Sequence, residues 1–132
     1  MSVRKQKYVV ANNVTKLYSW RQDVAVRALQ HLPEWWSKEA PVSLSCEFVF
    51  PRPKGHFSTA KGRTHETVPS APIHHIVSPD NDKLIRAVGD ALSVTQAVLR
   101  DDSLIVSIHS LKRYAQHDEP IRTTITVTAL DS

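Results

Sequence analysis

The chain has 132 residues, enough for one compact domain and too few for two. Apolar residues make up 41% and charged residues 23%, which is typical of a folded globular protein. No stretch approaches the roughly 18 uninterrupted apolar residues of a membrane span. Seventeen Lys and Arg against thirteen Asp and Glu give a net charge of +4, which is consistent with a polyanionic partner. The basic N-terminus lacks the apolar core of a signal peptide, and the lone Cys46 cannot form an internal disulfide. We therefore expect a cytoplasmic protein that is not attached to a membrane.

The first third of the chain predicts a strand, a helix and a second strand. Residues 8–13, YVVANN, have the composition of a short strand that ends in a turn. Ser19 and Gln22 have the spacing of a capping box, and Pro33 is expected to end the helix that follows. Apolar residues recur between them at the spacing of one helix face: Val24, Ala25, Ala28, Leu29 and Leu32. The alternating, β-rich run at 42–50 predicts the second strand, with Cys46 as a small buried group.

A long basic loop divides the chain. Residues 51–72 have no period, hold two of the three glycines and four of the eight prolines, and carry several cations. After this loop, IHHIV (73–77) predicts a short strand that leads into a helix. Two further strands are expected at 103–111 and 120–130, with a turn-rich link between them. The order of elements predicts an α+β fold in a single domain that covers residues 1–132.

The helix in the segment SPDNDKLIRAVGDALS (78–93) begins with carboxylates. Its apolar face is formed by Leu84, Ile85, Val88, Ala91 and Leu92. Asp80 and Asp82 would point about 200° apart if both were helical, so they converge only if Asp80 precedes the first turn. Pro79 supports a helix start at that point. Two carboxylates at a helix start are also favoured by the helix dipole alone, so a capping role remains an equal alternative.

A second acidic pair, Asp101 and Asp102, follows about twenty residues later at the entry to a predicted strand. This pair either returns beside the helix start or remains a solvated turn. Three or more converging carboxylates repel one another unless a divalent cation neutralises them. Carboxylate oxygens suit Mg²⁺ or Mn²⁺, and a metal site of this kind inside a basic protein fits phosphodiester chemistry. Convergence is an assumption of this interpretation.

These two blocks resemble the RusA family of Holliday-junction resolvases, and its phage-type members in particular. The family pattern is Asp-x-Asp-Asn-Leu-x-Lys-x-x-x-Asp-Ala-Leu, followed some nine residues later by Asp-Asp. Positions that match are Asp80, Asp82, Leu84, Asp90, Ala91, Leu92, Asp101 and Asp102. FVFPRPKGHF and PSAP are similar to the segment that precedes the motif, so the resemblance covers roughly residues 41–115. It implies a small mixed β-sheet with two main helices, and a homodimer with one Mg²⁺-dependent site per subunit.

By match to the family motif, Asp80, Asp82 and Asp102 take the metal-binding and catalytic roles, whereas Asp90 is expected to be structural. One departure concerns the cations. Lys83 and Arg86 stand where the family has Asn and a catalytic Lys. Arg86 keeps a permanent charge but cannot readily exchange a proton, and Lys83 lies about 60° away around the helix axis. The catalytic cationic role is therefore divided between these two residues.

The resemblance implies cleavage of four-way (Holliday) DNA junctions by paired nicks in DNA recombination and repair, through in-line hydrolysis. Cations of the basic loop and of the later strand are candidates for contacts with the DNA backbone: Arg52, Lys54, Lys61, Arg63, Lys112 and Arg113. Two rival interpretations are a non-catalytic junction- or duplex-binding module with a degenerate active site, and a purely structural interaction protein. A zinc site built on His74 and His75 is disfavoured, because adjacent strand residues point to opposite faces.

Overall fold

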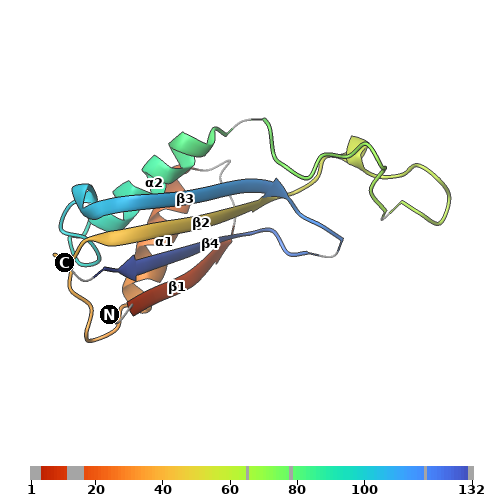
Figure 1. The fold of residues 1–132 in the computed structure, drawn as a ribbon. Helices are drawn as coiled ribbons and strands as arrows, with labels where there is room; N and C mark the ends of the chain where they lie inside the picture. Colours follow the sequence, from red (N-terminus) through yellow and green to blue (C-terminus); the bar gives the residue numbers. More distant parts are fainter. Residues whose placement is uncertain (1–3, 12–16, 65, 78, 118, 131–132) are drawn as a thin grey trace.

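The protein is a small α+β domain whose elements follow one another as the sequence pattern predicts (Figure 1). The computed structural model describes residues 4–11, 17–64, 66–77, 79–117 and 119–130. Its elements are β1 (Arg4–Ala11), α1 (Leu17–Gln30), β2 (Val42–Phe50), α2 (Asn81–Ser93), β3 (Ile105–Tyr114) and β4 (Arg122–Ala129), with short 3-10 turns η2 (Lys54–His56) and η3 (Asp102–Leu104). No helix in the described ranges is both long enough and apolar enough to span a membrane.

The four strands form one mixed sheet in the order β1-β4-β2-β3. β4 runs antiparallel to both of its neighbours, whereas β2 and β3 are parallel. β2 is therefore a central strand, with Cys46 between Ile125 of β4 and Ser110 of β3. Antiparallel strands can be joined by a tight turn, but parallel neighbours need a crossover connection. In this chain that connection contains α2.

Both helices cover the same face of the sheet (Figure 1). β2 alternates between buried and more accessible residues, as expected for a strand with one covered face. Its buried Phe48 lies 6.1 Å from the ring of Trp20 of α1, and Leu84 and Leu92 bring α2 into the same core. Burial of each of these large side chains contributes about 1.5–3 kcal/mol to stability. The apolar face predicted for α2 is buried apart from Ile85, which is partly exposed.

An ion pair also joins the two helices. Arg21 Nη2 of α1 donates a hydrogen bond of 2.9 Å to Asp90 Oδ2 of α2. The structural role that was expected for Asp90 is therefore visible in the contact between α1 and α2. Because both side chains are about 40% exposed, this pair is expected to contribute little to stability.

Residues 51–72 extend from the end of the sheet as an arm (Figure 1). The two sides of this arm are joined by backbone hydrogen bonds, from Ser58 N to Glu66 O at 2.8 Å and from Val68 N to His56 O at 2.9 Å. A β-bridge between Phe57 and Thr67 lies between them. The segment that lacks a period in the sequence is thus an arm whose described residues pair locally with one another.

Several boundaries differ from the sequence predictions. β1 begins at Arg4, four residues before the predicted strand, and β4 is Arg122–Ala129, slightly shorter than predicted. α1 begins at Leu17, so Ser19 lies inside the helix and the predicted capping box is wrong. β3 continues through Tyr114, because its last residues pair with both β2 and the segment before α2. Residues 73–77 form an isolated bridge, His74 to Arg113, in place of a regular strand. Asn12 and Asn13, which the first predicted strand includes, lie outside the described residues.

A compact ion-pair cluster closes the link between β3 and β4. Arg113 donates two hydrogen bonds of 2.5 Å to the carboxylate of Glu119, and its Nη2 lies 3.2 Å from Glu47 Oε1. Arg122 Nη2 lies 3.4 Å from Glu119 Oε2. The hydrogen bonds from Arg113 lower the pKa of Glu119 to about 2. The charged form of Glu119 is therefore favoured in the folded state.

Because of this cluster, we expect the free energy of unfolding to fall in acid. Because the pKa of Glu119 is lower in the folded chain than its ordinary value of 4.5, its contribution to stability is present above pH 4.5 and is lost as the pH falls toward 2. We expect Glu119→Gln to lower the free energy of unfolding at neutral pH and to flatten its dependence on pH in this window. Urea denaturation followed by circular dichroism measures both, with Glu66→Gln on the exposed arm as the control. Parallel pH curves for the wild type and Glu119→Gln would contradict the assignment.

Candidate active site

Two carboxylates are exposed at the start of α2. Asp80 is the N-cap residue, with the extended backbone (φ −69°, ψ 144°) typical of that position, and Asp82 lies in the first helical turn. The side chain of Asp80 forms no capping hydrogen bond. Its Oδ2 lies instead 3.7 Å from Nζ of Lys83. The carboxylate of Asp80 is therefore not committed to the helix end, and both acids face solvent where the helix dipole favours negative charge.

Hydrogen bonds from two residues of β3 hold the segment that carries these carboxylates. Nζ of Lys112 donates hydrogen bonds to the carbonyl oxygens of Val77 (2.8 Å) and Pro79 (2.6 Å). Nδ2 of Asn81 donates to the carbonyl of Ser110 at 3.3 Å, and the Ser110 hydroxyl donates back to Oδ1 of Asn81. These bonds hold the residues on either side of Asp80 against one strand. The motif comparison missed this positioning role of Asn81 and Ser110, which no pattern in the sequence reveals.

His75 anchors the same segment further upstream. Its ring is buried and stacks on Phe50 with centroids 3.9 Å apart and planes at 19°, and its backbone N–H donates to Lys112 O at 3.3 Å. Burial, followed by the charge of Lys112, lowers the pKa of His75 below its ordinary value. The neutral ring is thus a packing group. Among the described residues, no group of three or more His, Cys, Asp or Glu side chains that could hold a metal ion is found.

Two cations lie beside the acidic helix start. Lys83 and Arg86 are both exposed on α2, and Arg86 is one turn beyond Asp82. Arg86 forms no ion pair with any other residue that the structure describes. A free guanidinium and an ammonium at this position can bind an anionic group that approaches the carboxylates. The arrangement suits a phosphate held next to acidic groups.

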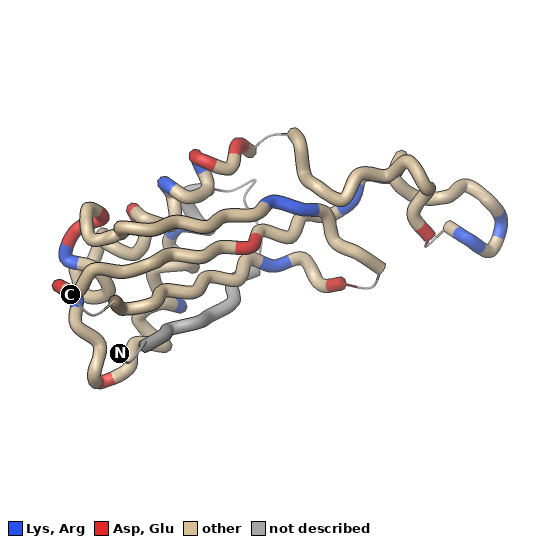
Figure 2. The backbone as a smooth tube through the Cα atoms, viewed as in Figure 1, with Lys and Arg blue, Asp and Glu red and all other residues tan. Residues whose placement is uncertain are grey.

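The second acidic pair lies at the other end of α2. Asp101 precedes η3 and accepts a hydrogen bond of 2.6 Å from the Ser103 hydroxyl, which lowers the pKa of Asp101. Asp102 is the first residue of η3. At about 1.5 Å per residue, the 13 residues of α2 span about 20 Å. Among the described residues, no group of three or more Asp, Glu, His or Cys side chains lies close enough together to hold a metal ion. Figure 2 shows the two groups of acidic residues at opposite ends of the helix.

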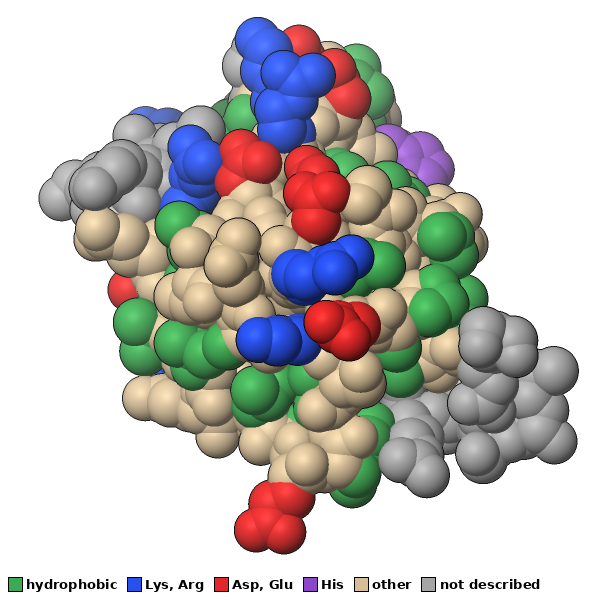
Figure 3. All heavy atoms as spheres, turned by 90° about the vertical axis from the view of Figure 1, so that its left-hand side faces the viewer, with side chains coloured by type: hydrophobic (Ala, Val, Ile, Leu, Met, Phe, Trp, Pro, Cys, Tyr) green, Lys and Arg blue, Asp and Glu red, His purple; other side chains and the backbone are tan. Residues whose placement is uncertain are grey.

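One chain therefore does not bring Asp102 together with Asp80 and Asp82. Within one subunit the pair at Asp101 and Asp102 is a solvated turn, the alternative that the sequence left open. The surface around it is mixed in charge, with Arg100 Nη1 3.9 Å from Glu39 Oε1. Figure 3 shows acidic and basic side chains close together on this side of the molecule.

The six candidate DNA-binding cations fall into two groups. Lys54, Lys61 and Arg63 are exposed on the arm (Figure 2). The other three have partners inside the fold. Arg52 donates from Nε to Ala115 O at 2.8 Å and from Nη1 to Pro72 O at 2.7 Å, and its guanidinium lies over the Tyr114 ring. Lys112 and Arg113 make the contacts described above. Of these six cations, only the three on the arm can contact a ligand without breaking a hydrogen bond that the structure shows within the protein.

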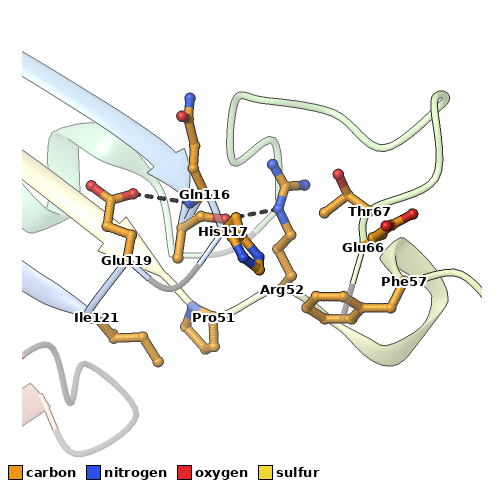
Figure 4. A pocket seen from close by; sticks show the side chains of 10 residues that line it. Pro51, Arg52, Phe57, Glu66, Thr67, Gln116, His117, Glu119 and Ile121 are labelled. Atoms are coloured by element: carbon orange, nitrogen blue, oxygen red, sulfur yellow. Dashed lines mark hydrogen bonds between the residues drawn. The ribbon is translucent and has the colours of Figure 1, made fainter. Parts of the chain in front are cut away.

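A cavity of about 660 Å³ opens at the base of the arm (Figure 4). Its lining comes from the start of the arm and from the link between β3 and β4, and includes Arg52, Phe57, Gln116 and Ile121. Glu119 also lines this cavity, although its carboxylate is bound by Arg113. The acidic residues at α2 are not part of the lining, so the cavity is separate from the candidate active site.

The anchoring role of Lys112 can be separated from a role in binding. We expect Lys112→Met to lower the free energy of unfolding by about 1–2 kcal/mol, because two hydrogen bonds from a charged group are lost. The matched change Lys61→Met, on the exposed arm, is expected to leave stability within about 0.5 kcal/mol of the wild type. Chemical denaturation measures both variants. An equal, negligible effect of the two changes would contradict the anchoring role.

One comparison with known proteins identifies the family. The model of the family described as Endodeoxyribonuclease RusA matches residues 2–128, nearly the whole chain. The match includes both acidic pairs, the cations of α2 and the arm. No individually curated protein matches the chain. The resemblance carried by the two motif blocks is thus confirmed over a longer range than the motifs themselves, and the chain belongs to the RusA endodeoxyribonuclease family.

Proposed function

We propose that the protein is a structure-selective endodeoxyribonuclease that resolves four-way DNA junctions by paired nicks, with Mg²⁺ as its cofactor and a homodimer as its working unit. Membership of the RusA family implies Holliday-junction resolvase activity. The observation that carries the proposal is the start of α2, where Asp80 and Asp82 are exposed on a segment fixed by Lys112 and Asn81. Paired nicks require two sites, which two subunits supply.

The residues at α2 can orient a phosphodiester. The positive end of the helix dipole and the side chains of Lys83 and Arg86 attract a phosphate oxygen, while the carboxylates face the same solvent region. Arg86 can stabilise the negative charge that develops on the phosphate, but its guanidinium does not exchange a proton at neutral pH. Proton transfer through a side chain of α2 would therefore fall to Lys83 or to a carboxylate.

The carboxylate oxygens of Asp80 and Asp82 are the ligand type that Mg²⁺ prefers. A bound Mg²⁺ would lower the pKa of a coordinated water and neutralise charge at the phosphate. The described residues of one chain nevertheless contain no group of three acidic ligands. A single subunit thus groups two of the three aspartates of the predicted metal site, and no step of the hydrolysis can be derived from it alone.

The arm supplies the proposed DNA contacts. Lys54, Lys61 and Arg63 are exposed on this arm, which extends beyond the end of the sheet (Figures 1 and 2). Contacts of this kind are with phosphates, act as a distributed set and weaken with salt. Because Arg52, Lys112 and Arg113 hold parts of the fold together, our proposal for DNA binding now depends on the three residues of the arm.

A non-catalytic junction-binding module is the second candidate. It is favoured by two observations, namely that Arg86 stands where the family has a catalytic Lys, and that one chain does not group the three aspartates. This candidate predicts salt-sensitive binding of branched DNA without metal-dependent cutting.

The two candidates differ in one assay. We expect the wild-type protein to nick a labelled mobile four-way junction in Mg²⁺ and not in EDTA, and Asp82→Asn to cut about 100-fold more slowly or not at all. Asp23→Asn, an exposed carboxylate on α1, is the matched control and is expected to retain activity. Gel-shift assays in EDTA, with linear duplex as competitor, are expected to show equal junction binding by all three proteins.

Absence of nicks from the wild type with either Mg²⁺ or Mn²⁺, together with intact junction binding, would favour the binding module. Absence of both nicks and salt-sensitive binding would contradict both candidates.

A further inference from the structure

Two hollows meet at the base of the arm. The larger is the cavity of about 660 Å³ described above, and a second of about 420 Å³ adjoins it. Four residues line both hollows: Arg52, Thr67, Gln116 and His117. The second hollow extends to Ile73, which begins the segment that leads into α2. Together the two hollows form a groove between the arm and the segment that carries the candidate active site.

Hydrogen bonds hold the walls of this groove in place. Arg52 donates from Nε to Ala115 O, in the link between β3 and β4, and from Nη1 to Pro72 O, at the end of the arm. Val68 N donates to His56 O and joins the two sides of the arm at its base. A preformed hollow of several hundred cubic ångströms is typical of a site for a small organic group.

The lining of the larger cavity suits a flat, uncharged group with polar edges. Figure 4 shows Pro51, Ile121 and the ring of Phe57 along one side of the cavity. Neither the Thr67 hydroxyl nor the side-chain amide of Gln116 forms a hydrogen bond within the described part of the chain. An aromatic ring stacks on a nucleobase, and an amide can both donate to its edge and accept from it.

The charges of the lining disfavour a phosphate inside the cavity. Among its described residues the lining has one cation and two carboxylates, namely Arg52, Glu66 and Glu119. The cation already has carbonyl partners, and Glu119 is paired with Arg113. Lys54, in contrast, is exposed in η2 and has no partner in the fold among the described residues. A bound nucleotide would therefore place its base inside the cavity and its phosphate outside, with the cations of the arm.

The cavity is close to the acidic segment along β3. Ala115, which lines the cavity, follows three residues after Lys112, whose ammonium group binds the carbonyl oxygen of Pro79 next to Asp80. Three extended residues span about 10 Å. About three stacked nucleotides span the same length of a DNA strand. A strand whose phosphate lies at the start of α2 can thus place a nearby base at the cavity.

We propose that this cavity binds one unpaired nucleobase of a branched DNA, stacked against Phe57 and hydrogen-bonded by Gln116, while the flanking phosphates lie along the arm. The inference rests on the proposed function, because the base belongs to the junction. A base inside a duplex cannot enter a cavity until it leaves its stack, and this costs least where pairing is already interrupted. The cavity thereby favours branched DNA over a linear duplex.

Abasic sites test this assignment. Four-way junctions that each lack one base near the crossover are compared with the intact junction in gel-shift assays in EDTA. We expect one or two positions at which loss of the base weakens binding by the wild type about tenfold. Phe57→Ala is expected to weaken binding of the intact junction by the same factor. At those positions it loses nothing further, because the base and the ring form one contact.

A second variant and its matched control separate this contact from a general effect on the arm. Gln116→Leu is expected to weaken binding of the intact junction about threefold to tenfold and to show the same dependence on position. Gln30→Leu, an exposed glutamine at the end of α1, is expected to leave binding unchanged. Circular dichroism checks that all variants are folded.

Free nucleotides are the other source of a nucleobase. We expect millimolar deoxynucleoside monophosphates, without DNA, to leave the Tm of the wild type unchanged, because phosphate contacts act as a distributed set. A rise in Tm that Phe57→Ala abolishes would overturn the assignment to DNA.

The cavity and the nuclease can fail separately. Junction binding with no position at which the abasic site and Phe57→Ala overlap would overturn the cavity as a base site, even if the protein nicks junctions. A wild type that binds no junction would overturn the cavity together with the proposed function. Overlapping losses at one or two positions would support the cavity even if no junction is cut.

Discussion

The parallel pairing of β2 with β3 constrains the rest of the molecule. Two parallel neighbours cannot be joined by a tight turn, so the chain must cross back over the sheet, and α2 is the helix that makes this return. The first turn of α2 lies beside the later part of β3, at Ser110. The last turns of α2 lie near the start of β3, at Ile105. Its buried face, which includes Leu84 and Leu92, fixes it over the core. Residues that flank α2 in sequence are therefore held at opposite ends of the sheet.

The start of α2 combines rigidity with exposure. Hydrogen bonds from Lys112 and the pair formed by Asn81 and Ser110 use backbone carbonyls and an amide, and the stacked ring of His75 packs the segment that leads into the helix. None of these contacts involves the carboxylate oxygens of Asp80. The acidic groups thus stay available to solvent on a backbone that packing and hydrogen bonds hold in place. Precise positioning of exposed charges is what a phosphodiester site requires.

Helices and strands whose apolar residues recur with a clear period could be predicted from the sequence. Features that depend on contacts between residues far apart in the chain could not. The alternating run 42–50 coincides with β2, and the apolar positions assigned to α2 form its buried face. The start of α1 was misplaced, because a capping-box pattern at Ser19 also occurs inside helices. Arg52 gives no sign in the sequence that its partners are the carbonyls of Ala115 and Pro72, which lie far along the chain. For the same reason the sequence could not decide whether the acidic pairs converge or lie apart, since the direction in which β3 pairs with β2 has no local signature.

Because one chain does not group Asp102 with Asp80 and Asp82, mixing of subunits gives the most direct test of whether the proposed homodimer forms its metal site from both chains. One chain carries Asp82→Asn and the other Asp102→Asn, and each alone is expected to be inactive on a four-way junction in Mg²⁺. If the site combines residues of both chains, each mixed dimer holds one site without a substitution and one site with two. The mixture is then expected to regain nicking, with single nicks in place of paired ones. A mixture that remains as inactive as its separate components, although subunit exchange has occurred, would contradict the shared site.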